Sequence, residues 1–203
     1  MSGYPVVLDG SAIEALIVGG GAVAARKARA LLDAGARVRV VAAAPSPALR
    51  ALADACPRCT VREGEYDAED IAGATLVYAA TDRAEVNAAV AADAARAHRL
   101  VNVADDPEAG TFVTVAAHRA GDLVVGVATG GVPGGAARIR DAIAARFDER
   151  YAVALHALAA LRRRLLDAGA RDEWRRAADA LIDERFCDRV ERGGYAEEVA
   201  AWR

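Results

Sequence analysis

A glycine turn between an apolar strand and a helix constrains this chain more than any other feature. Residues 14–43 are EALIVGGGAVAARKARALLDAGARVRVVAA: an apolar run, three glycines, a segment of helical periodicity and a second apolar run. Three consecutive glycines cost backbone entropy, so some group must approach this turn too closely for side chains. The order strand, glycine turn, helix, strand predicts a βαβ unit.

The glycines also fit a phosphate-binding pattern. Residues 19–24, GGGAVA, match G-x-G-x-x-G/A, with Ala24 in the last place. In this pattern Gly19 permits the sharp turn, Gly21 lets backbone N–H groups meet a pyrophosphate, and the small Ala24 allows close packing. The helix N-terminus adds about half a positive charge toward the phosphates. We therefore predict dinucleotide binding; the alternatives are a structural glycine turn and a relic site.

The rest of the chain predicts an α/β fold in two parts. Strand and helix patterns alternate five times up to Pro107, which is typical of a doubly wound parallel sheet. Residues 111–131 give two apolar runs around an Ala-Gly-Asp turn and predict an antiparallel hairpin. A glycine-rich link follows, then a helical pattern up to about residue 186. The final ERGGYAEEVAAWR is predicted to be a loosely attached tail.

Composition and charge exclude several classes of protein. The net charge of −3 argues against a nucleic-acid binder that neutralises phosphates. No apolar run approaches the ~18 residues of a membrane span. The start lacks the basic region and long apolar core of a signal peptide. Three cysteines in 203 residues make no disulfide scaffold, so we predict a reducing cytoplasm.

The candidate metal ligands are scattered. Cys56 and Cys59 form a C-x-x-C, which suggests half a zinc site or a redox pair. No second Cys/His pair with metal spacing exists, so two incidental loop thiols are favoured. His118, in the predicted hairpin turn, and His156, within a predicted helix, are interpreted as surface or packing residues. We predict no metal site.

Polar residues stand where ligands bind a parallel sheet, at the carboxyl ends of its strands. Thr81 and Asp82 follow one strand, and Asn102, Asp105 and Asp106 end another. The alternatives are a helix cap for the first pair and a solvated turn for the two aspartates. The second strand ends in VAAA, without the acid expected beside the adenine ribose. No basic pocket replaces that acid, so NAD is predicted and NADP stays open.

Four collinear motifs resemble a known family. IVGGGAVAARKARALLDAGARV, AATDRAEVN, VNVADDPEAGTF and VGVATGG occur in the order and spacing of the precorrin-2 dehydrogenase/sirohydrochlorin ferrochelatase family, the dehydrogenase domain of siroheme synthase. The resemblance spans about residues 5–185. It implies a Rossmann domain at residues 1–112, a dimerisation segment at 113–147, a helical C-terminal region at 148–203, and a homodimer. The methyltransferase domain of some relatives is expected to be absent.

The resemblance also implies an activity. Family members oxidise precorrin-2, a tetrapyrrole, to sirohydrochlorin with NAD+, and several then insert Fe2+ as a second substrate to give siroheme. Asp105 matches the catalytic aspartate, and Asp106 ranks second to it. By position, the cofactor-binding residues are Gly19, Gly21, Ala22, Val23, Ala43, Ala44, Thr81 and Asp82, and the substrate-binding residues are Asn102, Thr129, Gly130 and Arg138.

The chemistry of the substrate makes arginine a suitable partner. Precorrin-2 carries eight carboxylates, and guanidinium groups pair with carboxylates in a bidentate way. Arg138 and Arg140 follow the glycine link, with a solvated helix face as the alternative, stronger for Arg140. The family usually has serine where this chain has Ala128, and VPGGAAR replaces a Ser-Pro segment. These departures weaken the ferrochelatase prediction and leave the Rossmann prediction intact.

Two other functions stay open. One is a Rossmann dehydrogenase for another small metabolite, which would have no affinity for tetrapyrroles. The other is a non-catalytic NAD-sensing module, which would need an output element such as a basic recognition helix. Residues 162–164 are all arginine, but the turn of a helix-turn-helix is not evident.

Overall fold

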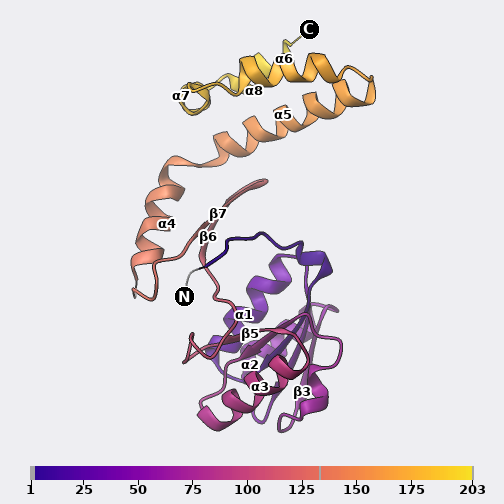
Figure 1. The fold of residues 1–203 in the computed structure, drawn as a ribbon, viewed down its shortest axis with the longest axis vertical. Coiled ribbons are helices and arrows are strands. Elements are labelled where there is room, and N and C mark those ends of the chain that lie inside the picture. Colours follow the sequence, from indigo (N-terminus) through magenta and orange to yellow (C-terminus); the bar gives the residue numbers. More distant parts are fainter. Residues whose placement is uncertain (1–2, 133, 203) are drawn as a thin grey trace. The chain divides into compact units, whose positions relative to one another are not determined.

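The chain divides between Thr114 and Val115 into two units (Figure 1). The computed structural model describes residues 3–132 and 134–202. Each unit has its own buried core.

A five-stranded parallel sheet forms the centre of the first unit. Its strands pair in the order β3-β2-β1-β4-β5, so β1 lies in the middle. β2 and β3 are added on one side of β1, and β4 and β5 on the other. This order confirms the predicted doubly wound sheet. The strands are β1 (Glu14–Val18), β2 (Arg37–Ala42), β3 (Cys59–Glu63), β4 (Leu76–Ala79) and β5 (Leu100–Val103).

Helices cover both faces of this sheet. The helical elements are η1 (Gly10–Ala12), α1 (Ala22–Asp33), α2 (Pro47–Ala55), η2 (Ala68–Ile71) and α3 (Ala84–Arg96). α1 and α2 pack with alternate strand residues such as Ile17 and Val40 on one face, and α3 packs with Leu16 and Val77 on the other. Ala24 and Ala28 of α1 are fully buried. Because these side chains are small, α1 can approach the sheet closely at its N-terminus.

The second unit pairs a hairpin with helices. Its elements are β6 (Ala116–Ala120), β7 (Leu123–Val127), α4 (Gly135–Arg146), α5 (Glu149–Asp167), α6 (Arg171–Leu181), α7 (Phe186–Arg192) and α8 (Tyr195–Ala200). The hairpin is antiparallel, as predicted, but begins later than residue 111. Thr111 and Phe112 instead donate backbone N–H groups to the carbonyl of Val101 in β5. Across the described ranges, no helix has both the length and the hydropathy to cross a membrane.

The prediction of a loose C-terminal tail was wrong. Residues 195–200 form α8, which packs against α5. Tyr195 and Val199 are 3% and 1% exposed, and the Tyr195 hydroxyl donates to the carbonyl of Leu181 at 2.5 Å. Gly193 and Gly194 have φ of +85° and +79°, a conformation that favours glycine and lets the chain turn back onto α5.

The C-x-x-C motif also differs from its predicted place in a loop. Cys56 caps the end of α2, and Cys59 begins β3 and is 4% exposed in the core. Both thiols are free. Burial, and to a smaller extent Cys56, raises the pKa of the Cys59 thiol. A higher thiol pKa lowers the thiolate fraction, so Cys59 has the character of a packing residue. Cys56 packs against the same core cluster.

Candidate active site

The glycine turn is held between the ends of β2 and β4. Gly19 donates its N–H to the carbonyl of Val41 at 2.9 Å, and the Gly20 carbonyl accepts from the Ser46 N–H at 2.9 Å. Gly19 has a φ of +140°, and a Cβ there would lie 2.2 Å from the carbonyl oxygen of Ala80. A Cβ at Gly20 would lie 2.2 Å from the carbonyl oxygen of Ala44. The protein's own backbone therefore excludes side chains at these two positions.

Gly21 stands in a different environment. A Cβ built on it meets nothing within 4 Å, so the space beside it is open. It is the N-cap of α1, it supplies no capping side chain, and the first helical turn holds no acidic residue. Ala22 and Val23 follow at the exposed start of the helix. Uncapped amides beside an open space fit the pyrophosphate of a dinucleotide.

The segment after β2 lies against this turn. Ala43 and Ala44 are exposed, and the carbonyl of Ala44 faces Gly20. Ser46 occupies the N-cap position of α2, but its side chain makes no capping hydrogen bond. Pro47, at the first helical position, has a φ suited to starting the helix without that bond.

Thr81 lies two residues beyond the end of β4, and its hydroxyl makes hydrogen bonds within the protein. Its Oγ1 accepts from the N–H of Arg83 at 3.1 Å and lies 2.7 Å from Oδ1 of Asn87. This geometry supports the alternative that Thr81 organises the start of α3. Asp82 is exposed at the same turn.

Asp105 and Asp106 differ in what they contact. Asp105 is exposed beyond the end of β5, and its Oδ1 accepts from Nδ2 of Asn87 at 2.9 Å. Asp106 instead accepts from the backbone N–H groups of Glu108 and Ala109 at 3.1 and 3.3 Å. Asp106 is thus committed to its own turn, whereas Asp105 is held toward the strand ends. Asn87 was not among the predicted site residues, although it ends the AATDRAEVN motif.

Asn102 lies deeper than a surface ligand-binding residue. It is 6% exposed, its Oδ1 accepts from Nζ of Lys27 at 2.7 Å, and its Nδ2 donates to the carbonyl of Phe112 at 3.0 Å. The Lys27 ammonium lies 4.9 Å from the ring centroid of Tyr78. Burial, and secondarily the charge of Arg26, lowers the pKa of Lys27. Substrate binding by Asn102 stays a prediction, and Lys27 is a neighbour that the sequence analysis missed.

The remaining predicted residues belong to the second unit. Thr129 donates through its hydroxyl to the carbonyl of Val132 at 3.3 Å, and Gly130 has a φ of +59° with open space around its Cα. Arg138 is exposed on α4 and forms no ion pair within residues 3–132 and 134–202. Arg140 differs, because its guanidinium binds the carboxylate of Asp141. The first unit therefore gathers the glycine turn and strand ends at one edge, and Thr129, Gly130 and Arg138 lie on the other unit.

The histidines have structural surroundings. His118 lies in β6, not in the hairpin turn where it was predicted, and its Nε2 is 2.6 Å from the carbonyl oxygen of Phe147. A carbonyl only accepts, so that nitrogen carries a proton and donates. His156 is exposed on α5. In the described part of the chain, no three His, Cys, Asp or Glu side chains cluster with metal-ligand geometry.

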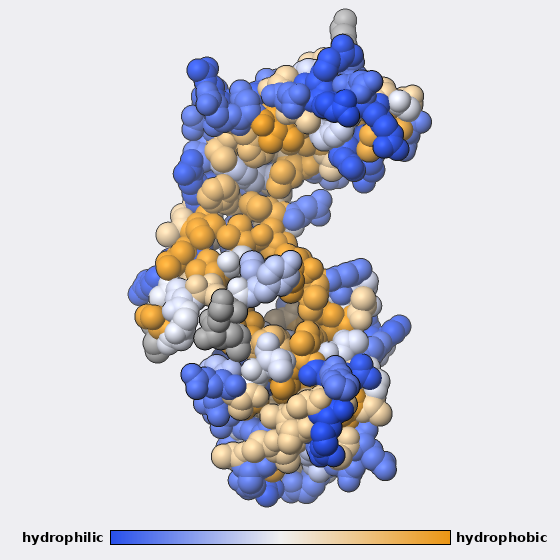
Figure 2. All heavy atoms as spheres, in the orientation of Figure 1, coloured by the Kyte–Doolittle hydropathy of each residue, from blue (hydrophilic) through white to orange (hydrophobic). Residues whose placement is uncertain are grey.

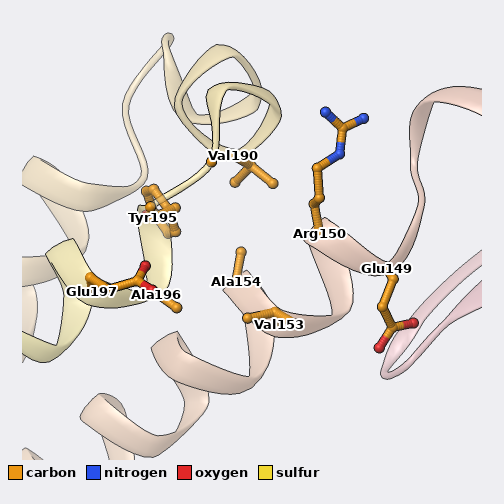
Figure 3. Close-up of a pocket in the computed structure, with 10 residues that line it drawn as sticks. Glu149, Arg150, Val153, Ala154, Val190, Tyr195, Ala196 and Glu197 are labelled. Carbon is orange, nitrogen blue, oxygen red and sulfur yellow. The ribbon is translucent and has the colours of Figure 1, made fainter.

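A cavity of about 290 Å³ opens between α5 and the start of α8. Figure 3 shows Val190, Ala154 and Tyr195 directed toward it. The Tyr195 hydroxyl is already bonded to the carbonyl of Leu181. Apolar side chains line the cavity together with the charged Glu149, Arg150 and Glu197, and none of the predicted site residues is among them.

Comparison with known families agrees with the geometry of the first unit. The family model described as "Putative NAD(P)-binding" matches residues 6–116, more than half of the chain. The chain belongs to this NAD(P)-binding family. The match covers the whole parallel sheet, including the glycine turn and Asp105, and confirms the prediction of a dinucleotide-binding domain at the level of NAD(P).

This NAD(P)-binding protein is also a homologue of siroheme synthases. It is 40% identical over 174 residues to the siroheme synthase of Chromobacterium violaceum, covering 73% of this chain and 36% of that one. It is 34% identical over 200 residues to that of Saccharophagus degradans, covering 98% of this chain and 42% of that one. It therefore spans well under half the length of these relatives.

A solved structure shares the complete fold of this NAD(P)-binding protein. The structure of "SirC, precorrin-2 dehydrogenase" aligns with a TM-score of 0.77, covering 97% of this chain and 98% of that one at 24% identity. The likeness extends beyond the matched NAD(P)-binding family to the hairpin and the C-terminal helices.

Proposed function

We propose that this protein is an NAD+-dependent precorrin-2 dehydrogenase that forms sirohydrochlorin for siroheme synthesis. The observation that carries the proposal is the position of Asp105, exposed at the same sheet edge as the glycine turn and linked to it through neighbouring residues. Gly19 adjoins Ala80 and Thr81, Thr81 bonds Asn87, and Asn87 bonds Asp105. The names of the homologues support the same substrate.

The reaction needs a base at this edge. Oxidation of precorrin-2 removes two electrons and two hydrogens, one as a hydride from carbon and one as a proton, and a new double bond forms in the macrocycle. NAD+ bound on the glycine turn supplies the hydride acceptor. The carboxylate of Asp105 takes the proton and returns it to solvent. Ala43 and Ala44 flank the adenosine ribose in this proposal, and Ala22, Val23 and Asp82 line the cofactor.

The surroundings of β2 favour NAD over NADP. The cation nearest in sequence to the end of that strand is Arg39, which could have met a 2′-phosphate. Its guanidinium instead donates to the carbonyls of Asp70 and Ala72, at 3.0 and 2.7 Å. A guanidinium engaged in this way would have to give up those bonds to hold a phosphate.

The carboxylates of the substrate would be met by the second unit. Arg138 is exposed and pairs with no carboxylate among the described residues, and Thr129 and Gly130 lie in the loop before it. The same carboxylate of Asp105 could accept pyrrole protons if Fe2+ is inserted as a second substrate. Ala128, where relatives carry serine, leaves dehydrogenation as the primary proposal.

We also propose that the protein is a homodimer assembled through residues 113–147. No residue of α4 is buried within the chain. Val115, Val132 and Ile139 are 46%, 61% and 48% exposed. Figure 2 shows apolar side chains gathered over this part of the second unit. A partner that covers them would remove their apolar surface from water.

The proposed compartment is a reducing cytoplasm, and the three free cysteines are consistent with it.

One assay tests the activity. The purified chain is incubated anaerobically with precorrin-2 and NAD+, and NADH and sirohydrochlorin are followed by absorbance. We expect both to form together, with Asp105→Ala at least about 100-fold slower. Fe2+ or Co2+ is then added to test chelation. Binding of NADH without any turnover of precorrin-2 would instead indicate another substrate or a sensing module.

A further inference from the structure

We propose that Asn87 is a positioning residue that holds the carboxylate of Asp105 for proton removal. This inference rests on the proposed function, because it assigns Asn87 a part in the step that Asp105 performs. Asn87 lies on the second turn of α3, facing the sheet, and is 2% exposed. It cannot touch a ligand from there, so any effect on the reaction must pass through its neighbours.

The side-chain amide of Asn87 uses its full hydrogen-bonding capacity. Its Oδ1 accepts from the Thr81 backbone N–H at 3.1 Å and lies 2.7 Å from the Thr81 hydroxyl oxygen. Its Nδ2 donates to the Thr81 carbonyl at 3.1 Å and to Oδ1 of Asp105 at 2.9 Å. An amide offers two donors and two acceptor lone pairs, and all four positions have a partner within hydrogen-bond distance; the single proton of the Thr81 hydroxyl can also reach the carbonyl of Arg83 at 3.0 Å.

This pattern fixes which way the amide faces. The Thr81 N–H can only donate, so it must meet the amide oxygen. The Thr81 carbonyl and an ionised Asp105 can only accept, so they must meet the amide nitrogen. A flipped amide would place oxygen against oxygen at both acceptors. The donor toward Asp105 is therefore set by the backbone of Thr81.

The consequence for Asp105 is a fixed carboxylate on an exposed turn. An exposed aspartate ordinarily samples several rotamers, and ordering it costs entropy. The bond from a buried amide holds Oδ1, and Oδ2, which has no partner in the part of the chain that the structure describes, can take the substrate proton. Asp106 has no such partner on α3, since its carboxylate caps its own turn. Asn87 thus distinguishes the two adjacent aspartates.

The competing interpretation is that Asn87 only anchors the loop after β4. Three of its four contacts go to Thr81, so loss of Asn87 could disturb the cofactor side of the site. The two roles differ in one respect. A loop anchor affects the reaction whether or not Asp105 is present, whereas a positioning residue has no effect once its carboxylate is gone.

The experiment is a double-mutant cycle with Asn87→Asp and Asp105→Ala. Asn87→Asp keeps an acceptor for the Thr81 N–H and hydroxyl and removes the donor to Asp105, but it also places a second carboxylate beside Asp105. Asn87→Ser adds no charge and is therefore measured in both backgrounds as well. We expect kcat for NADH formation from precorrin-2 to fall about 30-fold, with KM for precorrin-2 and Kd for NADH within about twofold of wild type. In the Asp105→Ala background, Asn87→Asp should change the residual rate by less than about twofold.

Asn87→Ser separates loss of the donor from repulsion between two carboxylates, and it replaces Asn87→Asp if that protein does not fold. A loss of kcat in Asn87→Asp that is absent from folded Asn87→Ser comes from repulsion and overturns the positioning role. An equal loss in both backgrounds, or a loss confined to NADH binding, overturns the positioning role. The positioning role is also overturned if folded Asn87 variants have a normal kcat while Asp105→Ala alone is slow. In that case the proposed function still stands. If Asp105→Ala itself turns over normally, the catalytic assignment of Asp105 fails, and the positioning role fails with it.

Discussion

Two glycine-rich turns, one in each unit, look alike in the sequence and need glycine for different physical reasons. In the first turn, a Cβ at Gly19 or Gly20 would lie 2.2 Å from a backbone oxygen of a neighbouring strand end. In the second, Gly131 and Gly134 have φ of +89° and +74°, and a Cβ at either would meet nothing within 4 Å. In the first turn neighbouring backbone excludes a side chain, and Gly19 also has a φ of +140°; in the second turn the left-handed backbone alone requires glycine.

The difference separates a packed site from an open loop. A methyl group that collides with backbone cannot be relieved by a rotamer change, so the sheet edge itself must move. A methyl group at positive φ costs about 1 kcal/mol of local strain and leaves the surroundings in place. Gly21 belongs to neither class, because its φ is −87° and its space is open. Replacing glycine by alanine at these positions is therefore expected to change stability and NADH affinity by different amounts.

The largest effect is expected for Gly20→Ala. Its methyl group would meet the carbonyl of Ala44, and relief would displace the end of β2 from the turn. We expect the free energy of unfolding of the first unit to fall by about 3 kcal/mol. NADH affinity should fall with it, by at least about tenfold. Denaturation followed by circular dichroism and an NADH fluorescence titration measure the two effects.

Tryptophan fluorescence supplies the control for Gly20→Ala. Both tryptophans of the chain, Trp174 and Trp202, lie in the second unit. They pack against its core, so their emission reports on that unit. A loss of stability seen equally by tryptophan emission would contradict a defect local to the glycine turn. An unchanged stability by circular dichroism would show that the turn has more room than its geometry indicates.

A titration tests how densely the first unit is packed. Burial raises the pKa of Tyr78 from 10.0 to about 12. The folded state then binds more protons than the unfolded state between these values, so stability present below pH 10 is lost as the pH approaches 12. We expect the wild type to lose about 2 to 3 kcal/mol more than Tyr78→Phe across this interval. Urea denaturation at several pH values measures it, and parallel curves would contradict it.

The sheet was predictable because its signal is local. Each buried strand is a short apolar run, and each turn carries Gly, Pro or polar residues close by in the sequence. The glycine pattern and the polar residues at the strand ends were predicted in the same way, whereas the catalytic role of Asp105 came from the family resemblance and stays a prediction. These features depend on neighbours along the chain, which a sequence displays directly.

What could not be predicted depends on contacts across the fold. Asn87 and Asp105 are 18 positions apart, and their hydrogen bond needs α3 and the end of β5 to be adjacent. From the sequence alone, Asn87 is only a polar residue that interrupts the apolar pattern on the buried face of α3. Helix α8 has six residues, too few for a clear periodicity, and the burial of Tyr195 and Val199 against other helices decides its place.

Gly21→Ala distinguishes the two explanations of the first glycine turn, pyrophosphate binding and a purely structural role. Alanine is allowed at its φ and meets no atom of the protein, so stability should stay within about 0.5 kcal/mol of wild type. If a pyrophosphate occupies the open space, NADH affinity should fall about tenfold or more, which is about 1.4 kcal/mol. The same two titrations used for Gly20→Ala measure it. Lost stability with retained affinity would return the turn to a purely structural role.

The smallest effect is expected in the second loop. Gly131→Ala places a methyl group at a φ of +89° in open space, so the cost is backbone strain alone. We expect about 1 kcal/mol less stability in the second unit, detected by Trp174 and Trp202 emission during urea denaturation. NADH affinity should remain within twofold of wild type, because the first unit holds the glycine turn. A loss of NADH affinity as large as that of Gly21→Ala would mean that the two turns act on one ligand, and the contrast between a packed site and an open loop would fail.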